Sequence, residues 1–237
     1  MINLGDYTVI DLEMTGLQPK MDKIIEVGAV KVRNGEIIDT LEYMVNPRCA
    51  IPERIQELTG ITDEMVQDGL EEDEAVQKLL VFIGEDVLVG QNVIFDYSFL
   101  KQWAINHRIP LELKAWDTLR LAQKLLPKEQ PKKLEALCEY FNIERKRAHR
   151  ALDDALETKM VFEKLVKLVE CQEALLEPKI LQYKAKRQTP ATAHQLERLK
   201  EYIALHNIKE EINYERLTRS EASRLMDKFL SIYGRKP

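Results

Sequence analysis

The chain has 237 residues, of which 45% are hydrophobic and 32% charged, and its net charge is -5. At about 150 residues per domain, this length predicts one full-sized domain and a small second one. The composition is that of a globular protein with a buried core, which excludes a short peptide, a disordered chain and a collagen-like chain. Net negative charge argues, at first, against a nucleic-acid ligand.

Cysteine usage and the distribution of apolar residues bear on the compartment. Cys49, Cys138 and Cys171 are odd in number and widely spaced, and no CxxC pair offers a zinc or redox site. The N-terminus lacks a basic segment followed by an apolar stretch, so we expect no secretory signal. No apolar run approaches the roughly 20 residues of a membrane span. We therefore expect a soluble, cytoplasmic protein with no membrane partner.

Charge is distributed unevenly along the chain. Residues 178–237 contain 13 Lys and Arg against 7 Asp and Glu, a balance of +6, which leaves -11 for residues 1–177. A polar, basic stretch follows Pro178 and has the composition of a linker. We therefore predict a domain over residues 1–177, a basic linker over residues 178–189 and a small helical module over residues 190–237.

The first domain alternates strand and helix patterns. Short runs rich in β-forming residues predict strands over residues 7–12, 23–33, 36–45, 86–90 and 113–116. Asn34-Gly35 predicts a type I′ turn between the second and third. Helical patterns lie before residue 58 and over residues 73–83, 97–107, 118–126, 133–141 and 150–169. This order predicts an α/β domain in which helices flank a mixed five-stranded sheet.

The C-terminal module carries helix signals. Thr189 as N-cap, with Pro190 at the first position, predicts a helix to about residue 206. Thr218-x-x-Glu221 is a capping box for a second helix that ends at Gly234. Apolar residues recur at helical spacing in both segments, which predicts a small core rather than a ligand site.

Two acidic residues end the first predicted strand. Asp11 and Glu13 lie two residues apart, so both side chains leave the same face of the sheet. Two carboxylates this close repel each other, and a divalent cation between them relieves the repulsion. A solvated strand end is the alternative explanation.

Further candidate carboxylates follow later in the chain. Asp96 comes after the fourth predicted strand, where open α/β sheets bind ligands, although it could equally be a helix N-cap. Asp153 and Asp154 begin the last helix of the domain. At about 100° per residue, Asp153 lies about 180° from the apolar stripe of this helix and Asp154 only about 80° from it. We therefore predict that Asp153 faces water and that Asp154, with His149 before the helix, faces a cleft.

Together these segments resemble the three exonuclease motifs of the DnaQ-like DEDDh family. The matching segments, in chain order, are Asp11-x-Glu13 with Thr15-Gly16, Asn92-x-x-Phe95-Asp96, and His149-x4-Asp154. The resemblance covers about residues 5–170 and includes Leu58-Thr-Gly-Ile-Thr62 and Trp116-Asp-Thr-Leu. Met14 and Gln91 depart from it, since the family often has Thr and His at these places. The resemblance implies a ribonuclease H-like fold.

The resemblance also implies a set of site residues. Asp11, Glu13, Asp96 and Asp154 would hold two divalent ions, Mg²⁺ or Mn²⁺, and His149 would take the proton from the attacking water, because imidazole titrates near neutral pH. The nucleotide at the 3′ end would contact a further group of residues: Met14, Thr15, Gly16, Leu17, Thr59, Asn92 and Phe95. A simple turn would also explain the glycine in this group.

The activity implied is a 3′-5′ exonuclease that acts on single-stranded DNA and releases nucleoside monophosphates in proofreading, repair or end trimming. The alternatives are an exoribonuclease and a nucleic-acid or polymerase-binding adaptor with a vestigial nuclease site. We expect some of the basic residues near the site to contact phosphates, and ordinary surface charge is the alternative for each of them. These residues are Lys132, Lys133, Arg145, Lys146, Arg147 and Arg150. The basic segment 178–237 is a candidate contact for phosphates, for a polymerase or for another protein partner.

Overall fold

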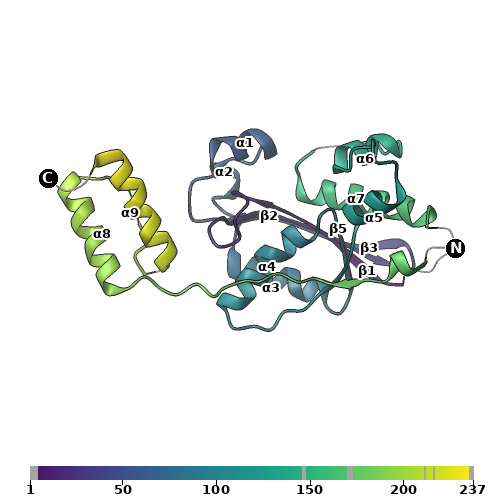
Figure 1. The fold of residues 1–237 in the computed structure, drawn as a ribbon. Coiled ribbons are helices and arrows are strands. Elements are labelled where there is room, and N and C mark those ends of the chain that lie inside the picture. Colours follow the sequence, from purple (N-terminus) through teal and green to yellow (C-terminus); the bar gives the residue numbers. More distant parts are fainter. Residues whose placement is uncertain (1–4, 146–147, 170–172, 211, 216, 235–237) are drawn as a thin grey trace. The chain divides into compact units, whose positions relative to one another are not determined.

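The computed structural model describes residues 5–145, 148–169, 173–210, 212–215 and 217–234, and Figure 1 shows its elements. Cys171 lies outside the described residues. The chain forms two compact units, Met1–Ala185 and Lys186–Pro237, which are described separately below. Within the described part of the chain, no helix is both long and apolar enough to cross a membrane.

The first unit is built on a mixed sheet with the strand order β4-β3-β2-β1-β5-β6-β7. The strands are Tyr7–Met14 (β1), Ile24–Arg33 (β2), Glu36–Asn46 (β3), Leu70–Glu71 (β4), Val87–Gly90 (β5), Lys114–Asp117 (β6) and Lys179–Ile180 (β7). β1 and β3 pair antiparallel with β2, whereas β5 runs parallel to β1 and β6 parallel to β5. The predicted mixed sheet is confirmed with seven strands instead of five. The sequence pattern missed β4 and β7 because two residues cannot display alternation.

Helices cover both faces of this sheet (Figure 1). They are Glu53–Thr59 (α1), Asp63–Val66 (α2), Glu72–Ile83 (α3), Ile94–Asn106 (α4), Thr118–Leu125 (α5), Leu134–Tyr140 (α6) and Ala151–Lys167 (α7). α3 and α4 pack in one apolar cluster, and α5, α6 and α7 pack in another. α2 is a single turn that the sequence pattern missed, and a 3-10 turn covers Glu173–Leu176.

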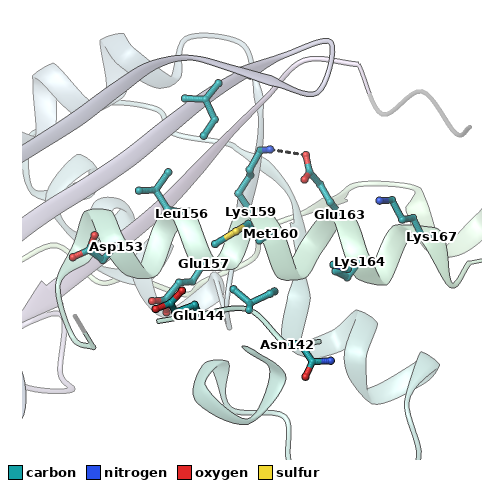
Figure 2. Close-up of a pocket in the computed structure, with 12 residues that line it drawn as sticks. Asn142, Glu144, Asp153, Leu156, Glu157, Lys159, Met160, Glu163, Lys164 and Lys167 are labelled. Atoms are coloured by element: carbon teal, nitrogen blue, oxygen red, sulfur yellow. Dashed lines mark ion pairs between the residues drawn. The ribbon is translucent and has the colours of Figure 1, made fainter. Parts of the chain in front are cut away.

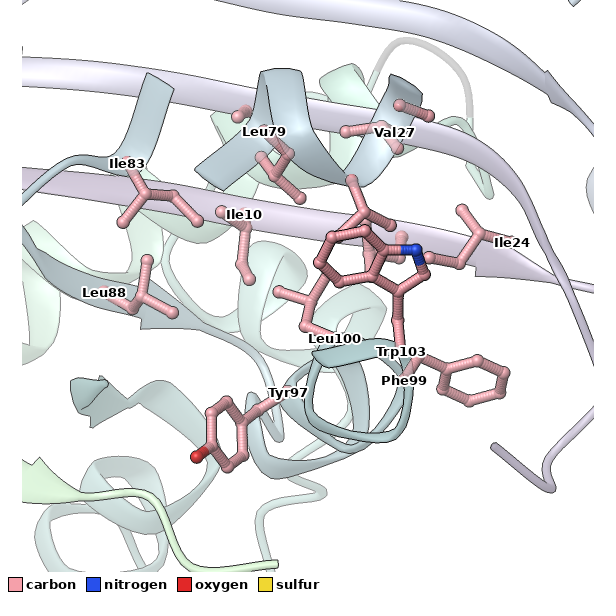
Figure 3. Packing of buried hydrophobic residues seen from close by; sticks show 14 of the residues in the cluster. Ile10, Ile24, Val27, Leu79, Ile83, Leu88, Tyr97, Phe99, Leu100 and Trp103 are labelled. Carbon is pink, nitrogen blue, oxygen red and sulfur yellow. The ribbon is translucent and has the colours of Figure 1, made fainter. Parts of the chain in front are cut away.

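The alternation along β1 decides which helices each of its residues meets. Ile10 points into the cluster of α3 and α4, which Figure 3 shows in close-up. Tyr7 points to the other face, where its ring lies 5.5 Å from that of Phe162 in α7. Asp11 and Glu13 continue the series of Tyr7, because side chains alternate with a period of two. Both acidic residues therefore lie on the face that α7 covers.

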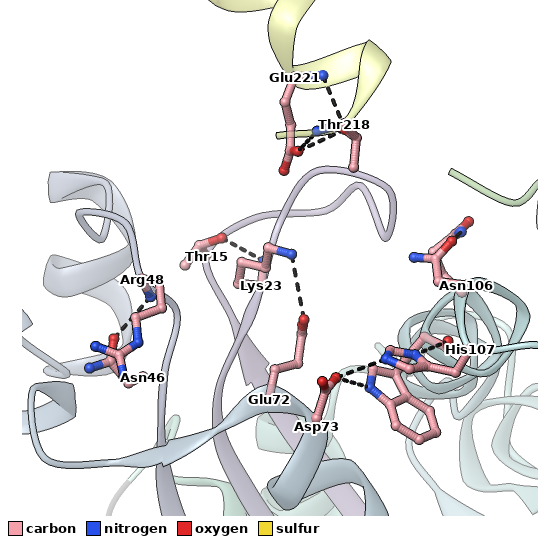
Figure 4. Close-up of polar contacts among 12 residues, drawn as sticks. Thr15, Lys23, Asn46, Arg48, Glu72, Asp73, Asn106, His107, Thr218 and Glu221 are labelled. Carbon is pink, nitrogen blue, oxygen red and sulfur yellow. Dashed lines mark hydrogen bonds and ion pairs between the residues drawn. The ribbon is translucent and has the colours of Figure 1, made fainter. Parts of the chain in front are cut away.

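The second unit is a pair of helices, Ala193–His206 (α8) and Arg219–Tyr233 (α9). The predicted N-cap at Thr189 is wrong, because α8 begins after Thr192, which forms a capping box with Gln195. Two threonines offered a cap, and only Thr192 has a glutamine three residues later to complete the box. The predicted capping box of Thr218 and Glu221 is confirmed (Figure 4), with Gly234 as the C-cap.

The candidate active site

The centre of the candidate site is the junction of β1 and β2. In the antiparallel register, Asp11 lies opposite Gly28 and Glu13 lies opposite Glu26. Directly opposed residues of antiparallel strands point to the same face of a sheet. The carboxylates of Asp11, Glu13 and Glu26 therefore share one face, the face toward α7.

Asp96 reaches this junction from the first turn of α4. β1 pairs with β5 only from Tyr7 to Val9, so Leu12 lies beyond that pairing. The Leu12 backbone N–H donates instead to Asp96 Oδ1 at 3.0 Å. The alternative that Asp96 is the helix N-cap is wrong, because α4 has Val93 in that position. The buried Asp96 carboxylate therefore binds the open edge of β1 beside Asp11.

The start of α7 lies directly on β2. A Cβ atom at Gly28 would lie 2.1 Å from the carbonyl carbon of Ala151, the first residue of α7, so only glycine permits this approach. Asp154 is buried in the first turn of the helix. His149 precedes the helix with a φ of 59°, in the left-handed region. One ligand atom each from Glu13, His149 and Asp154 lies within 4.8 Å of the other two.

Burial and repulsion raise the pKa of the carboxyl groups on β1. The pKa of Asp11 lies well above its usual range because the group is buried and because Asp96, Glu13 and Asp154 carry like charges nearby. Burial, followed by the charges of Asp154 and Glu26, raises the pKa of Glu13 to about 8. Without a cation, the ionised forms of these neighbouring carboxyl groups are therefore unfavourable.

The other two carboxyl groups of the cluster are displaced in the same direction. Burial raises the pKa of Asp96 to about 7, against the effect of its backbone hydrogen bonds. Burial also raises the pKa of Asp154, although the Arg145 guanidinium acts in the opposite sense. Clustered carboxylate oxygens are the donors that hard divalent cations prefer, and such a cation would relieve the repulsion. The residues of the cluster therefore fit a divalent metal ion.

The prediction that Asp153 faces water is wrong. Its exposed fraction is 8%, and it lines a pocket of about 630 Å³ between α7, residues 142–144 and Ile37 of β3 (Figure 2). A helical wheel records only the apolar stripe of α7 itself. It does not record the residues of other segments, such as Ile37 and residues 142–144, that line the same pocket as Asp153.

Two of the basic residues expected near phosphates are paired with carboxylates. Arg145 donates from Nη2 to Asp154 Oδ1 and from Nε to Glu157 Oε2, both at 2.6 Å. Arg150 forms an ion pair with Glu26. Lys132 donates to backbone carbonyl groups of its own loop, at 2.7 Å to that of Pro127. Lys146 and Arg147 lie outside the described residues, and Lys133 is exposed before α6.

The segment after Glu13, expected to hold the terminal nucleotide, forms a closed loop. The Lys23 backbone N–H donates to Thr15 Oγ1 at 2.9 Å, a contact drawn in Figure 4. Gly16 lies against Asp22 so closely that a Cβ atom would approach a carboxylate oxygen to 2.5 Å. Leu17 is 76% exposed, whereas Met14 is buried in the apolar core. The nucleotide contacts of this segment stay a prediction.

The remaining residues expected to contact substrate lie on three different elements. Thr59 is buried in α1, and its hydroxyl bonds to the backbone on both sides. Asn92 is exposed with a φ of 58°, and its N–H donates to Asp117 at 3.1 Å. Phe95 packs edge-on against Phe99 at 5.6 Å. Their roles toward substrate also stay predictions.

Gln91, where the family often has His, has a structural role. Its amide nitrogen donates to the Lys132 carbonyl at 2.7 Å, and its amide oxygen accepts from the Thr118 hydroxyl at 2.5 Å. The side chain therefore ties the end of β5 to α5 and to the loop before α6.

The sequence reasoning missed Glu26. This residue is fully buried in β2, where its neighbours over residues 24–30 are all apolar. A glutamate in such a run is rarely buried without a partner, which is the signal that could have drawn attention to it. Its partner could not be named, because the distance in sequence to Arg150 carries no information about contact.

The fold and the acidic cluster define a nuclease-like α/β protein, and comparison with known sequences identifies the family. Residues 8–162 match the RNase_T family model, described as Exonuclease, so the chain belongs to this exonuclease family. The PolC-type DNA polymerase III of Clostridium perfringens is 40% identical over 153 residues, which cover 65% of this chain and 11% of that protein. The chain thus spans about a ninth of the length of this relative.

Solved structures confirm the predicted fold. The nuclease domain of 3′hExo, a DEDDh family member bound to rAMP, superposes with a TM-score of 0.60 at 22% identity, over 76% of this chain and 97% of that one. Exonuclease X in complex with 5′ overhanging duplex DNA gives a TM-score of 0.55 at 23% identity, over 70% and 92%. The predicted ribonuclease H-like architecture is therefore confirmed.

Proposed function

We propose that the chain is a metal-dependent 3′-5′ exonuclease that hydrolyses the terminal phosphodiester bond of single-stranded DNA and releases nucleoside monophosphates. One observation carries this proposal. Ligand atoms of Glu13, His149 and Asp154 gather within 4.8 Å of one another, on the sheet face where Asp11 also lies. These are the residue types that phosphodiester hydrolysis with divalent metal requires.

In this proposal Asp11, Glu13, Asp96 and Asp154 hold two divalent ions, Mg²⁺ or Mn²⁺. Bound there, the ions supply Lewis-acid stabilisation of the charge that develops on the phosphate. The chain contributes the fixed positions of the carboxylates. Asp96 is held by the Leu12 N–H at 3.0 Å, and strand β1 fixes Asp11 and Glu13 on one face.

His149 is the proposed general base. It accepts the proton of the attacking water at an imidazole nitrogen, beside the carboxylates of Glu13 and Asp154. The left-handed backbone at this residue turns the chain immediately before α7. A general base must lie within reach of the reacting water, and the position of His149 beside Glu13 and Asp154 supports this role.

DNA is the preferred substrate in this proposal, because the relatives are DNA polymerases and because Exonuclease X was solved with DNA. RNA is the second candidate, since the nuclease domain of 3′hExo was solved with rAMP. Proofreading, repair or end trimming in the cytoplasm is the proposed setting. A polymerase or other protein partner that binds residues 178–237 belongs to the same proposal.

Digestion of labelled strands tests this function. Asp11→Ala and Asp154→Asn should reduce the release of nucleotides from 3′-labelled single strands to the level seen with EDTA, whereas Asp153→Asn, the neighbouring control, should stay within about threefold of the wild type. Matched DNA and RNA strands, labelled at either end and supplied with Mg²⁺ or Mn²⁺, report substrate and polarity. Full activity of Asp154→Asn, or equal loss in both neighbours, would refute the assignment.

A further inference from the structure

The candidate site contains a fifth carboxylate whose contacts differ from those of the other four. Glu26 is 0% exposed and lies opposite Glu13 on β2. Its Oε1 accepts from Arg150 Nε at 2.9 Å and from Nη2 at 2.7 Å. Its Oε2 accepts from the backbone N–H of Ala151 at 2.9 Å. Both oxygens are thus bonded to the start of α7.

We propose that the Glu26–Arg150 ion pair positions His149 and Asp154 for the reaction, an inference that rests on the proposed nuclease function. Arg150 is the N-cap residue of α7, and Ala151 is its first residue. Glu26 therefore holds the chain at the two residues that follow His149, about one helical turn before Asp154. Glu26 and Arg150 are thus positioning residues, because they act through the backbone that they hold in place.

Electrostatics argue that Glu26 contributes geometry and not charge to the cluster. Its carboxylate adds to the repulsion on Glu13, while Arg150 acts in the opposite sense. An apolar residue would fill the same space without this repulsion. An apolar residue cannot accept hydrogen bonds, whereas the Glu26 carboxylate accepts from two nitrogens of Arg150 and from the Ala151 N–H. Together these bonds fix both the orientation of the helix start and its distance from β2.

The backbone at this place needs such support. His149 has a φ of 59°, a conformation that is unfavourable for residues other than glycine and that persists where surrounding contacts impose it. Gly28 allows α7 to approach β2, but a glycine can only permit contact. The Glu26–Arg150 ion pair supplies the attraction that holds the helix start in that position.

Arg150→Lys tests the proposal, because lysine keeps the charge and loses the two-nitrogen contact. Arg33→Lys is the matched control. Arg33 likewise donates from two nitrogens to one carboxylate, to the two oxygens of Asp86 at 2.9 and 3.0 Å, and its side chain is 26% exposed against 19% for Arg150. Its pair lies at the opposite end of β2 from Glu26. Both variants lose one such contact in the same unit, and only one of them adjoins the site.

Three quantities are measured for both variants: the single-turnover rate of strand digestion, the Mn²⁺ affinity without nucleic acid by calorimetry, and the melting temperature. We expect Arg150→Lys to lower rate and Mn²⁺ affinity by about 10- to 100-fold, the range seen when residues that orient metal ligands are changed. Arg33→Lys should lower the melting temperature similarly and leave rate and affinity within about twofold. Glu26→Gln should follow Arg150→Lys, because its amide nitrogen cannot accept a hydrogen bond.

The outcomes separate this inference from the proposed function. Equal rates and equal Mn²⁺ affinities in Arg150→Lys and Arg33→Lys would overturn the positioning role. A wild-type protein that digests no strand would overturn the proposed function. In that case the calorimetry still decides, because weaker Mn²⁺ binding in Arg150→Lys alone would support the positioning of Asp154, and unchanged binding would refute it.

Discussion

Replacing Glu13 with glutamine should stabilise the metal-free protein while it removes metal-dependent digestion. Burial and the charges of Asp154 and Glu26 raise the pKa of Glu13 to about 8, against about 4.3 for an exposed glutamate. Between these values the folded protein keeps a proton that the unfolded chain releases. The free energy of unfolding of the wild type therefore falls as the pH rises through this window. Glutamine does not titrate, so the free energy of unfolding of the variant does not fall in this way.

The magnitude follows from the two proton affinities. Each tenfold difference between them corresponds to about 1.4 kcal/mol. The penalty that Glu13→Gln removes is then at most about 1 kcal/mol at pH 5 and about 4 kcal/mol at pH 8. At about 2–4 °C per kcal/mol for a domain of this size, the variant should melt several degrees above the wild type at pH 8.

Thermal unfolding in EDTA, followed by circular dichroism at pH 5, 7 and 8, measures this difference. Glu36→Gln, at an exposed carboxylate of β3, is the control and should match the wild type at each pH. Addition of Mn²⁺ at pH 8 should stabilise the wild type more than Glu13→Gln. The electrostatic reasoning would be refuted if the difference in melting temperature between Glu13→Gln and the wild type did not change with pH. A variant less stable than the wild type at pH 8 would also refute it.

Two further predictions concern packing and capping. Gly28→Ala should reduce the free energy of unfolding by about 1–3 kcal/mol and slow digestion, because its methyl group would displace the start of α7; unchanged denaturant unfolding and digestion would contradict this. Thr218→Ala should cost the C-terminal unit about 1 kcal/mol. Hydrogen exchange should report that loss in the amides of α9, while those of the sheet keep their protection.

Local chemistry made much of the fold predictable. The Asn34-Gly35 dipeptide predicted its turn, and both residues adopt the positive φ that a type I′ turn needs, 51° and 83°. The period of two along β1 predicted that Asp11 and Glu13 share a face. These features depend on residues that are neighbours in the chain, so the sequence pattern contains them.

The features that could not be predicted depend on contacts between distant segments. Asp153 lines a pocket together with residues of β3 and of the loop after α6, which are distant in the sequence. The pairing of Glu26 with Arg150 joins residues 124 apart and requires the start of α7 to pack on β2. A single sequence states which residues need partners, and it does not state where the partners lie.

The early end of β5 leaves part of the central strand without a neighbour in the middle of the sheet. The Leu12 N–H on this edge is buried, and a buried backbone N–H without an acceptor costs about 1–3 kcal/mol. In this protein Asp96 occupies that edge through the Leu12 N–H. The same carboxylate thus caps a backbone N–H of the sheet and is also a candidate metal ligand. Loss of Asp96 would therefore lower stability as well as the proposed metal binding, whereas loss of Asp154 would leave the Leu12 N–H paired.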